Sequence, residues 1–171
     1  PSQRVPQGGP DLIAFASESF PPGQPIAVGA MDLMCRIHED FSFDPSATTV
    51  STPISEVLAK RRGVCQDFAQ IMITGLRAAG IPAAYASGYI RTLPPPGQPR
   101  LVGADATHAW VLIWGGPEHG WVGVDPTNGI WMAGDHIIVA IGRDAQMALG
   151  ELGLPTTGVR HPSYGGQREF M

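Results

Sequence analysis

The chain has 171 residues and a formal net charge of −4, with 43% hydrophobic and 15% charged residues. This length suits a single domain with its own core, and the composition excludes a disordered chain. The negative charge argues against nucleic-acid binding, and no apolar run approaches the ~20 residues of a membrane span. No segment has the pattern of a signal peptide. We therefore expect neither a nucleic-acid nor a membrane partner.

Apolar residues recur every three to four positions in four segments, which predicts four helices over residues 12–19, 25–41, 54–60 and 65–79. Arg61-Arg62-Gly63 is expected to end the third helix, with two cations and then a glycine in the usual places. Gly80 and Pro82 are expected to end the fourth.

Strands are predicted over residues 83–90, 108–114, 121–125 and 136–141. The turn over residues 115–120 makes the second and third an antiparallel hairpin. Pairing Trp114 with Trp121 places Thr127 opposite His108 and puts Asp125 on the same face of the sheet as His108. A slip of one residue would put these two side chains on opposite faces.

These elements predict an α+β fold with three parts. Residues 1–24 are an N-terminal lead-in, residues 25–144 form the core, and residues 145–171 are a tail in which no element is predicted. The proline-rich loop over residues 92–105 is long for a compact domain, and such loops are often functional.

Cys65 is the candidate nucleophile. It stands at the start of the fourth predicted helix, where the helix dipole stabilises the negative charge of a thiolate, the form that attacks a carbonyl carbon. The backbone N–H of Cys65 could stabilise an oxyanion, and the Gln66 side chain could donate a second hydrogen bond. The alternatives are a buried structural thiol for Cys65 and a helix-surface residue for Gln66.

His108 and Asp125 are the candidate partners. A carboxylate within reach fixes the tautomer of an imidazole and holds its ring against a nucleophile. The alternatives are a core histidine and a simple turn, because Asp125 begins the turn-forming segment Asp125-Pro126-Thr127-Asn128-Gly129. Trp110 shares a face with His108 and could line the cleft.

No metal or other cofactor is expected. The other histidines (His38, His119, His136 and His161) show no metal-ligand spacing and are expected to be exposed or in loops. The chain has only two cysteines, and Cys35 lies in an apolar helical pattern typical of a buried free thiol. Few cysteines without a framework indicate a reducing compartment, so a cytoplasmic location is expected.

Taken together, several motifs resemble the transglutaminase-like superfamily, specifically its bacterial and archaeal protease-like branch. They are Arg62-Gly63-Val64-Cys65-Gln66-Asp67-Phe68-Ala69, Ala79-Gly80-Ile81-Pro82-Ala83, Gly88-Tyr89, His108-Ala109-Trp110 and Trp121-Val122-Gly123-Val124-Asp125-Pro126-Thr127-Asn128. The resemblance implies a papain-related fold with the cysteine helix packed on an antiparallel sheet. It also implies that Cys65 is the nucleophile, His108 the general base and acid, and Asp125 the orienting residue.

The predicted function is thiol-dependent acyl transfer on peptide or protein amides through a thioester, with hydrolysis of a cysteine peptidase or amidase kind preferred. Transfer to a lysine amine, as in a transglutaminase, is the first alternative. Arylamine N-acetyltransferases use the same three residue types, but their flanking motifs differ from those around Cys65. The remaining alternative is a binding module that has the same fold but no catalytic activity. The sequence predicts no oligomeric state.

Overall fold

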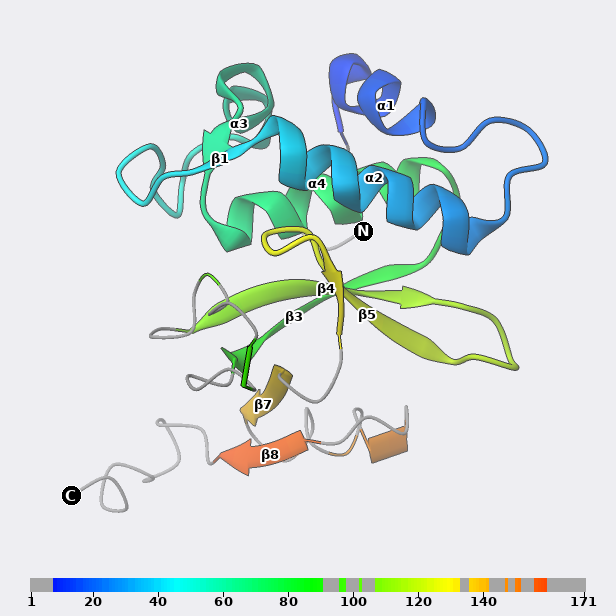
Figure 1. Ribbon diagram of the computed structural model, residues 1–171, viewed down its shortest axis with the longest axis vertical. Helices are drawn as coiled ribbons and strands as arrows, with labels where there is room; N and C mark the ends of the chain where they lie inside the picture. Colours follow the sequence, from blue (N-terminus) through cyan, green and yellow to red (C-terminus); the bar gives the residue numbers. More distant parts are fainter. Residues whose placement is uncertain are drawn as a thin grey trace.

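The helices form one layer of the molecule. The computed structural model describes residues 8–90, 96–97, 102, 107–132, 136–141, 147, 150–151 and 156–159. Within these residues the layer contains α1 (Pro10–Ser17), α2 (Ile26–Asp40), α3 (Ile54–Lys60) and α4 (Cys65–Ala78), and Figure 1 shows it lying over one side of the sheet. The structure confirms the four predicted helices, with bounds that differ from the predicted ones by at most two residues.

The second layer is a six-stranded sheet with the order β6-β5-β4-β3-β7-β8. Its strands are β3 (Ala83–Ile90), β4 (His108–Trp114), β5 (Trp121–Asp125), β6 (Ile130–Trp131), β7 (His136–Ile141) and β8 (Thr156–Val159). Neighbours are antiparallel except β7 and β8, which are parallel. The four predicted strands are confirmed with their predicted bounds. Strand β8 lies in the segment 145–171, where no element was predicted.

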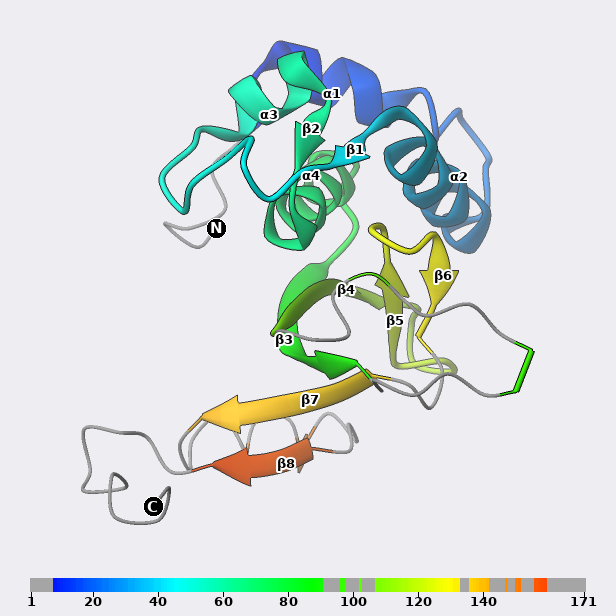
Figure 2. The ribbon, with the colours of Figure 1, turned by 60° about the vertical axis from the view of Figure 1, so that its left-hand side comes forward.

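Two further short strands lie among the helices. Strands β1 (Ser42–Phe43) and β2 (Arg62–Gly63) pair in parallel, and Figure 2 shows them between α2, α3 and α4. Neither was predicted, because two residues are too few to produce an alternating pattern. Strand β2 runs directly into α4, so this pairing anchors the chain just before Cys65.

Helix α4 joins the two layers. Its residues Phe68, Met72 and Leu76 follow one another at intervals of one helical turn and are at most 2% exposed. They belong to a single core with Leu33 of α2 and Val111 of β4. Burial of such side chains stabilises the fold by roughly 1.5–3 kcal/mol each.

Helix α1 belongs to the same core, although it comes from the segment predicted as a lead-in. Leu12 and Phe15 are 2% and 7% exposed, and Arg36 of α2 places its guanidinium 4.3 Å from the centre of the Phe15 ring. The first helix therefore helps to fix α2 and α4.

The register of the hairpin confirms the predicted pairing. Trp114 pairs with Trp121 and Val111 pairs with Val124. Because side chains alternate along a strand, Val111 faces the helices while Trp110 belongs to a second, smaller core on the other face. Asp125 and His108 share the face of Trp110, as the sequence predicted.

Gly88 lets strand β7 lie close against β3. A Cβ on this residue would stand 1.8 Å from the carbonyl oxygen of Ile137 and 2.9 Å from the Trp110 ring. We expect Gly88→Ala to push β7 outward and to lower the free energy of unfolding by about 1–3 kcal/mol or more, measured by urea denaturation. Gly9→Ala is the control, because a Cβ there meets no atom within 4 Å. Equal stability of the two variants would contradict the prediction.

Candidate active site

The first turn of α4 is held by Asp67. Its Oδ2 accepts hydrogen bonds from the Val64 backbone N–H at 2.9 Å and from the Thr48 hydroxyl at 2.6 Å. Asp67 is only 5% exposed, and a Cβ on Gly63 would lie 2.6 Å from the same oxygen. The sequence Gly63-Val64-Cys65-Gln66-Asp67 is therefore a compact helix start, and it fixes Cys65 as the first residue of α4.

Gly63 was expected to terminate α3, but the helix ends at Arg61 instead. Arg61 itself adopts the left-handed conformation, with φ of 53°, and its N–H donates to the Val57 carbonyl. Its guanidinium lies 4.6 Å from the centre of the Phe15 ring and 4.7 Å from that of Phe41. These two contacts help to hold an arginine where a glycine is usual.

His108 and Asp125 form a buried pair. His108 Nε2 donates to Asp125 Oδ2 at 2.9 Å, and both side chains are fully buried. The Cys65 thiol lies beside the same ring. The structure therefore brings together all three residues that the sequence predicted as a triad, from α4, β4 and β5.

The Asp125 carboxylate is surrounded by donors. Oδ1 accepts from the backbone N–H groups of Thr127 at 2.9 Å and Asn128 at 3.3 Å. Oδ2 accepts from the Asn128 side-chain amide at 2.7 Å, in addition to His108. Burial alone would raise the pKa of Asp125, but the hydrogen bonds from His108 and His136 outweigh burial and hold the pKa far below its ordinary value. The segment predicted as a turn is both a turn and part of the site.

Helix α2 also holds this turn. His38 Nδ1 donates to the Thr127 carbonyl at 2.9 Å, and Gly129 adopts a φ of 65° beneath the His38 ring. His38 is exposed, as the sequence predicted, and it still contributes this hydrogen bond to the turn. His119 is exposed as well, and His161 lies outside the described residues.

The pKa of His108 is raised. Burial would lower it, but the interactions with Asp125 and Cys65 outweigh burial and bring the pKa to about 9. The ring is therefore an imidazolium at neutral pH. Its Nδ1 is buried and has no hydrogen-bond partner in the described part of the chain.

Trp110 and Gln66 occupy different surroundings. Trp110 is 0% exposed and stacks on His108, with ring centres 6.2 Å apart and planes 22° apart. It packs behind the imidazole instead of lining an open cleft. Gln66 follows Cys65 in the first turn of α4 and is half-buried.

Tyr85 is a residue that the sequence analysis missed. Burial raises the pKa of its phenol, and the charges of Cys65 and Asp67 raise it further. The ring therefore lies near Cys65, and the residue is 42% exposed, so it borders the candidate site on the solvent side. No sequence signal marks Tyr85, because its place depends on how β3 packs against the start of α4.

The expectation that His136 is exposed or in a loop is wrong. His136 is the first residue of β7, is 9% exposed and donates from Nε2 to Asp125 Oδ2 at 3.1 Å. Its ring meets the Trp110 ring edge-on, with centres 5.0 Å apart. The strand was predicted correctly, but its pairing with β3 was not predicted, because β4, β5 and β6 lie between the two strands along the chain.

Among the described residues, His108, Asp125 and His136 form a group with possible metal-ligand atoms within 4.8 Å of one another. Both Nε2 atoms already lie at hydrogen-bond distance from the same carboxylate oxygen. The two Nδ1 atoms have no partner in this part of the chain, whereas a histidine that binds a metal usually donates its other N–H to a second group. The geometry fits a hydrogen-bond network better than a metal centre.

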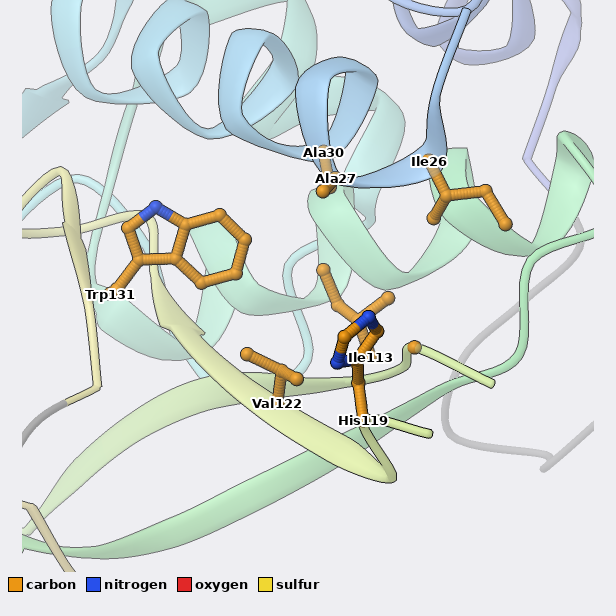
Figure 3. Close-up of a pocket in the computed structure, with 8 residues that line it drawn as sticks. Ile26, Ala27, Ala30, Ile113, His119, Val122 and Trp131 are labelled. Carbon is orange, nitrogen blue, oxygen red and sulfur yellow. The ribbon is translucent and has the colours of Figure 1, made fainter. Parts of the chain in front are cut away.

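An apolar pocket of about 440 Å³ lies elsewhere, between the start of α2 and the hairpin of β4 and β5 (Figure 3). Ile113, Val122 and Trp131 line its floor and wall, with Ile26 and His119 at its sides. Ile113 is five positions along β4 from His108, roughly 16 Å away, and points to the opposite face of the sheet. The pocket is therefore separate from the His108–Asp125 pair.

Comparison with known proteins identifies the family of the chain. The family model described as "Transglutaminase-like superfamily" matches residues 20–126. The chain belongs to the transglutaminase-like superfamily. This match confirms the family that the sequence motifs resembled, and it ends at the residue after Asp125.

Two curated relatives show the range of similarity within this superfamily. The protein Rv2569c of Mycobacterium tuberculosis, which has no assigned function, is 47% identical over 133 residues, covering 76% of this chain and 42% of its own length. A protein-glutamine gamma-glutamyltransferase of Pseudomonas aeruginosa is 40% identical over 124 residues, covering 70% of this chain and 18% of its own. The chain thus spans less than half the length of these relatives.

Solved structures share the fold. A candidate cysteine protease from Cytophaga hutchinsonii is 25% identical with a TM-score of 0.60, over 76% of this chain and 40% of that one. The periplasmic domain of TgpA from Pseudomonas aeruginosa, bound to ethylmercury, is 36% identical with a TM-score of 0.53, over 74% and 47%. In the described residues of our chain, no helix has the length and apolarity needed to span a membrane.

Proposed function

We propose that this transglutaminase-like domain catalyses acyl transfer from an amide through a thioester on Cys65, with water as the preferred acceptor. One observation carries the proposal: the cysteine at the start of α4 lies beside His108, which is itself bonded to the buried carboxylate of Asp125. Nucleophile, base and orienting group are the parts that such chemistry needs.

In the proposed reaction the Cys65 thiolate attacks the carbonyl carbon and forms a C–S bond. The carbonyl oxygen becomes an oxyanion, which the Cys65 backbone N–H at the helix start is placed to stabilise. The imidazolium of His108 then gives its proton to the departing nitrogen, the C–N bond breaks, and an amine or ammonia leaves. Water, deprotonated by His108, then attacks the thioester carbonyl, the C–S bond breaks, the carboxylic acid product leaves, and the Cys65 thiolate and the His108 imidazolium are restored.

A second acceptor is favoured by one comparison. The Pseudomonas relative at 40% identity carries the name protein-glutamine gamma-glutamyltransferase, whereas the Cytophaga structure is described as a candidate protease. A primary amine that attacks the same thioester would give an isopeptide product in place of an acid. The substrate is proposed to be a peptide or protein amide, and the cytoplasmic location predicted from the two cysteines is part of this proposal.

The test is a glutamine-containing peptide incubated with the domain, with and without a biotinylated primary amine. We expect ammonia or peptide-acid release that Cys65→Ala abolishes, a loss of at least about 10⁴-fold. Cys35→Ala is the matched control, since Cys35 is also a free, partly buried helix cysteine, and it should retain activity. Turnover that survives in Cys65→Ala would refute the proposal.

Mass spectrometry of the same reactions separates the acceptors. Biotin on the peptide would establish amine transfer, and acid alone would establish hydrolysis. A Cys65 that reacts with no reagent faster than Cys35 would instead support a binding module on this fold.

A further inference from the structure

We propose that His136 is a positioning residue of this site: its Nε2–H and that of His108 share the Asp125 carboxylate, and its ring braces Trp110 behind His108. This inference rests on the proposed function, because a positioning residue needs a reaction to serve. It adds a fourth side chain, from a fourth element of the fold, to the three that form the triad.

The first argument is the pattern of hydrogen bonds on one oxygen. Asp125 Oδ2 accepts from His108 at 2.9 Å, from His136 at 3.1 Å and from the Asn128 amide at 2.7 Å. A carboxylate with donors on three sides cannot rotate without breaking at least one bond. The direction in which Oδ2 faces His108, and hence the tilt of the imidazole, is set partly by His136.

The second argument is the aromatic packing. Trp110 stacks on His108 with ring centres 6.2 Å apart, and His136 meets Trp110 edge-on with ring centres 5.0 Å apart. His136 is therefore linked to His108 through the carboxylate and through the indole, and the two imidazole rings also lie with their centres 6.2 Å apart. A histidine whose role was only to pack in the core would not require a hydrogen bond from its Nε2 to a buried carboxylate.

The third argument concerns charge. The titratable groups that surround the network are Cys65 of α4, His108 of β4, Asp125 of β5 and His136 of β7, with Asp67 and Tyr85 around Cys65. A second donor on Asp125 draws part of the carboxylate charge away from His108. Without that donor, the remaining ion pair becomes tighter and the imidazolium becomes harder to deprotonate.

The experiment compares His136→Phe with His136→Gln. Phenylalanine keeps an aromatic ring against Trp110 but removes the donor, whereas glutamine can place an amide N–H near the position of Nε2. His119→Phe, an exposed histidine far from the triad, is the matched control. The readout is the rate at which iodoacetate alkylates Cys65 as a function of pH, since an adjacent imidazolium attracts this anionic reagent.

For His136→Phe we expect the alkaline limb of this profile to move up by roughly half a pH unit, and turnover to fall about tenfold. His136→Gln should restore the position of the limb, and His119→Phe should leave it unchanged. Equal effects of Phe and Gln, or an unmoved limb in His136→Phe, would show that His136 is only a packing residue and would overturn the proposal.

Two measurements on the unmodified domain guard against variants that fail to fold. Nitrogen-15 NMR of the histidine rings should show the proton of His136 on Nε2, and a bare Nε2 would overturn the proposal. If EDTA abolished the pH dependence of Cys65 alkylation and zinc restored it, the site would be a metal centre, and this result would also overturn the proposal. If Cys65 proves unreactive in the native protein, the proposed function fails, whereas the ring spectra still report on His136 alone.

Discussion

Asp125→Asn is expected to lower turnover by about 10³–10⁴-fold, the effect of losing the orienting carboxylate in a triad. In the native site the carboxylate accepts from His108 Nε2, which fixes the proton on that nitrogen and leaves Nδ1 for the Cys65 sulfur. An asparagine can present its amide N–H to the same nitrogen, and His108 then adopts the opposite tautomer. The measurement is kcat/KM on the peptide substrate over a range of pH.

The same substitution should lower the free energy of unfolding by about 3–5 kcal/mol, because it removes one partner of a buried pair. Five hydrogen bonds converge on this carboxylate, so their loss affects the turn after β5 as well as His108. Asp32→Asn is the control: it makes the same chemical change on the exposed side of α2 and should alter neither quantity. Activity within tenfold of the native level in Asp125→Asn would contradict the assignment of Asp125.

The second large effect concerns pH. The pKa of His108 is raised from its ordinary 6.5 to about 9, so the imidazolium persists through neutrality and is lost as the pH rises through about 9. We expect alkylation of Cys65 by iodoacetate to fall over the same range. Alkylation by the neutral reagent iodoacetamide should not fall there, and Cys35 provides an internal reference in each digest. An alkaline limb near pH 6.5 would refute the raised pKa.

The free energy of unfolding should also depend on pH through His108 and Asp125, which act at opposite ends of the pH range. Because the folded pKa of His108 is raised, its contribution is complete below about pH 6.5 and disappears as the pH rises through about 9. Because the folded pKa of Asp125 is lowered, its contribution is present above about pH 4 and is lost as the pH falls further. Urea unfolding across this range should therefore show its maximum between these limits, and in Asp125→Asn the alkaline decline should vanish.

Much of the site could be predicted because it depends on local patterns. The position of Cys65 follows from the helix start that its flanking residues predict. That His108 and Asp125 lie on the same face of the sheet follows from a hairpin whose turn fixes the register. Both are properties of short, continuous segments. The family resemblance then assigned roles to the same residues.

The missed features depend on packing between distant segments. His136 reaches Asp125 only because β7 pairs with β3, and no turn residue or hydrophobic period specifies that pairing. Likewise, Gly63 was predicted as a helix terminator, whereas its lack of a side chain leaves room for the carboxylate of Asp67. The predicted loop over residues 92–105 lies largely outside the described residues; within it, Val102 exchanges hydrogen bonds with the Asn128 side chain.

The order of the elements along the chain has a consequence for biosynthesis. Among the described residues, α1, α2, α3 and α4 all precede Gly80, while the six strands of the large sheet follow it. As the chain leaves the ribosome, Cys65 emerges well before His108, Asp125 and His136. The nascent helical half therefore carries the Cys65 thiol before its neighbours exist, and the four side chains meet only when the sheet has been synthesised and has docked. The proposed activity would thus begin only once the sheet is in place.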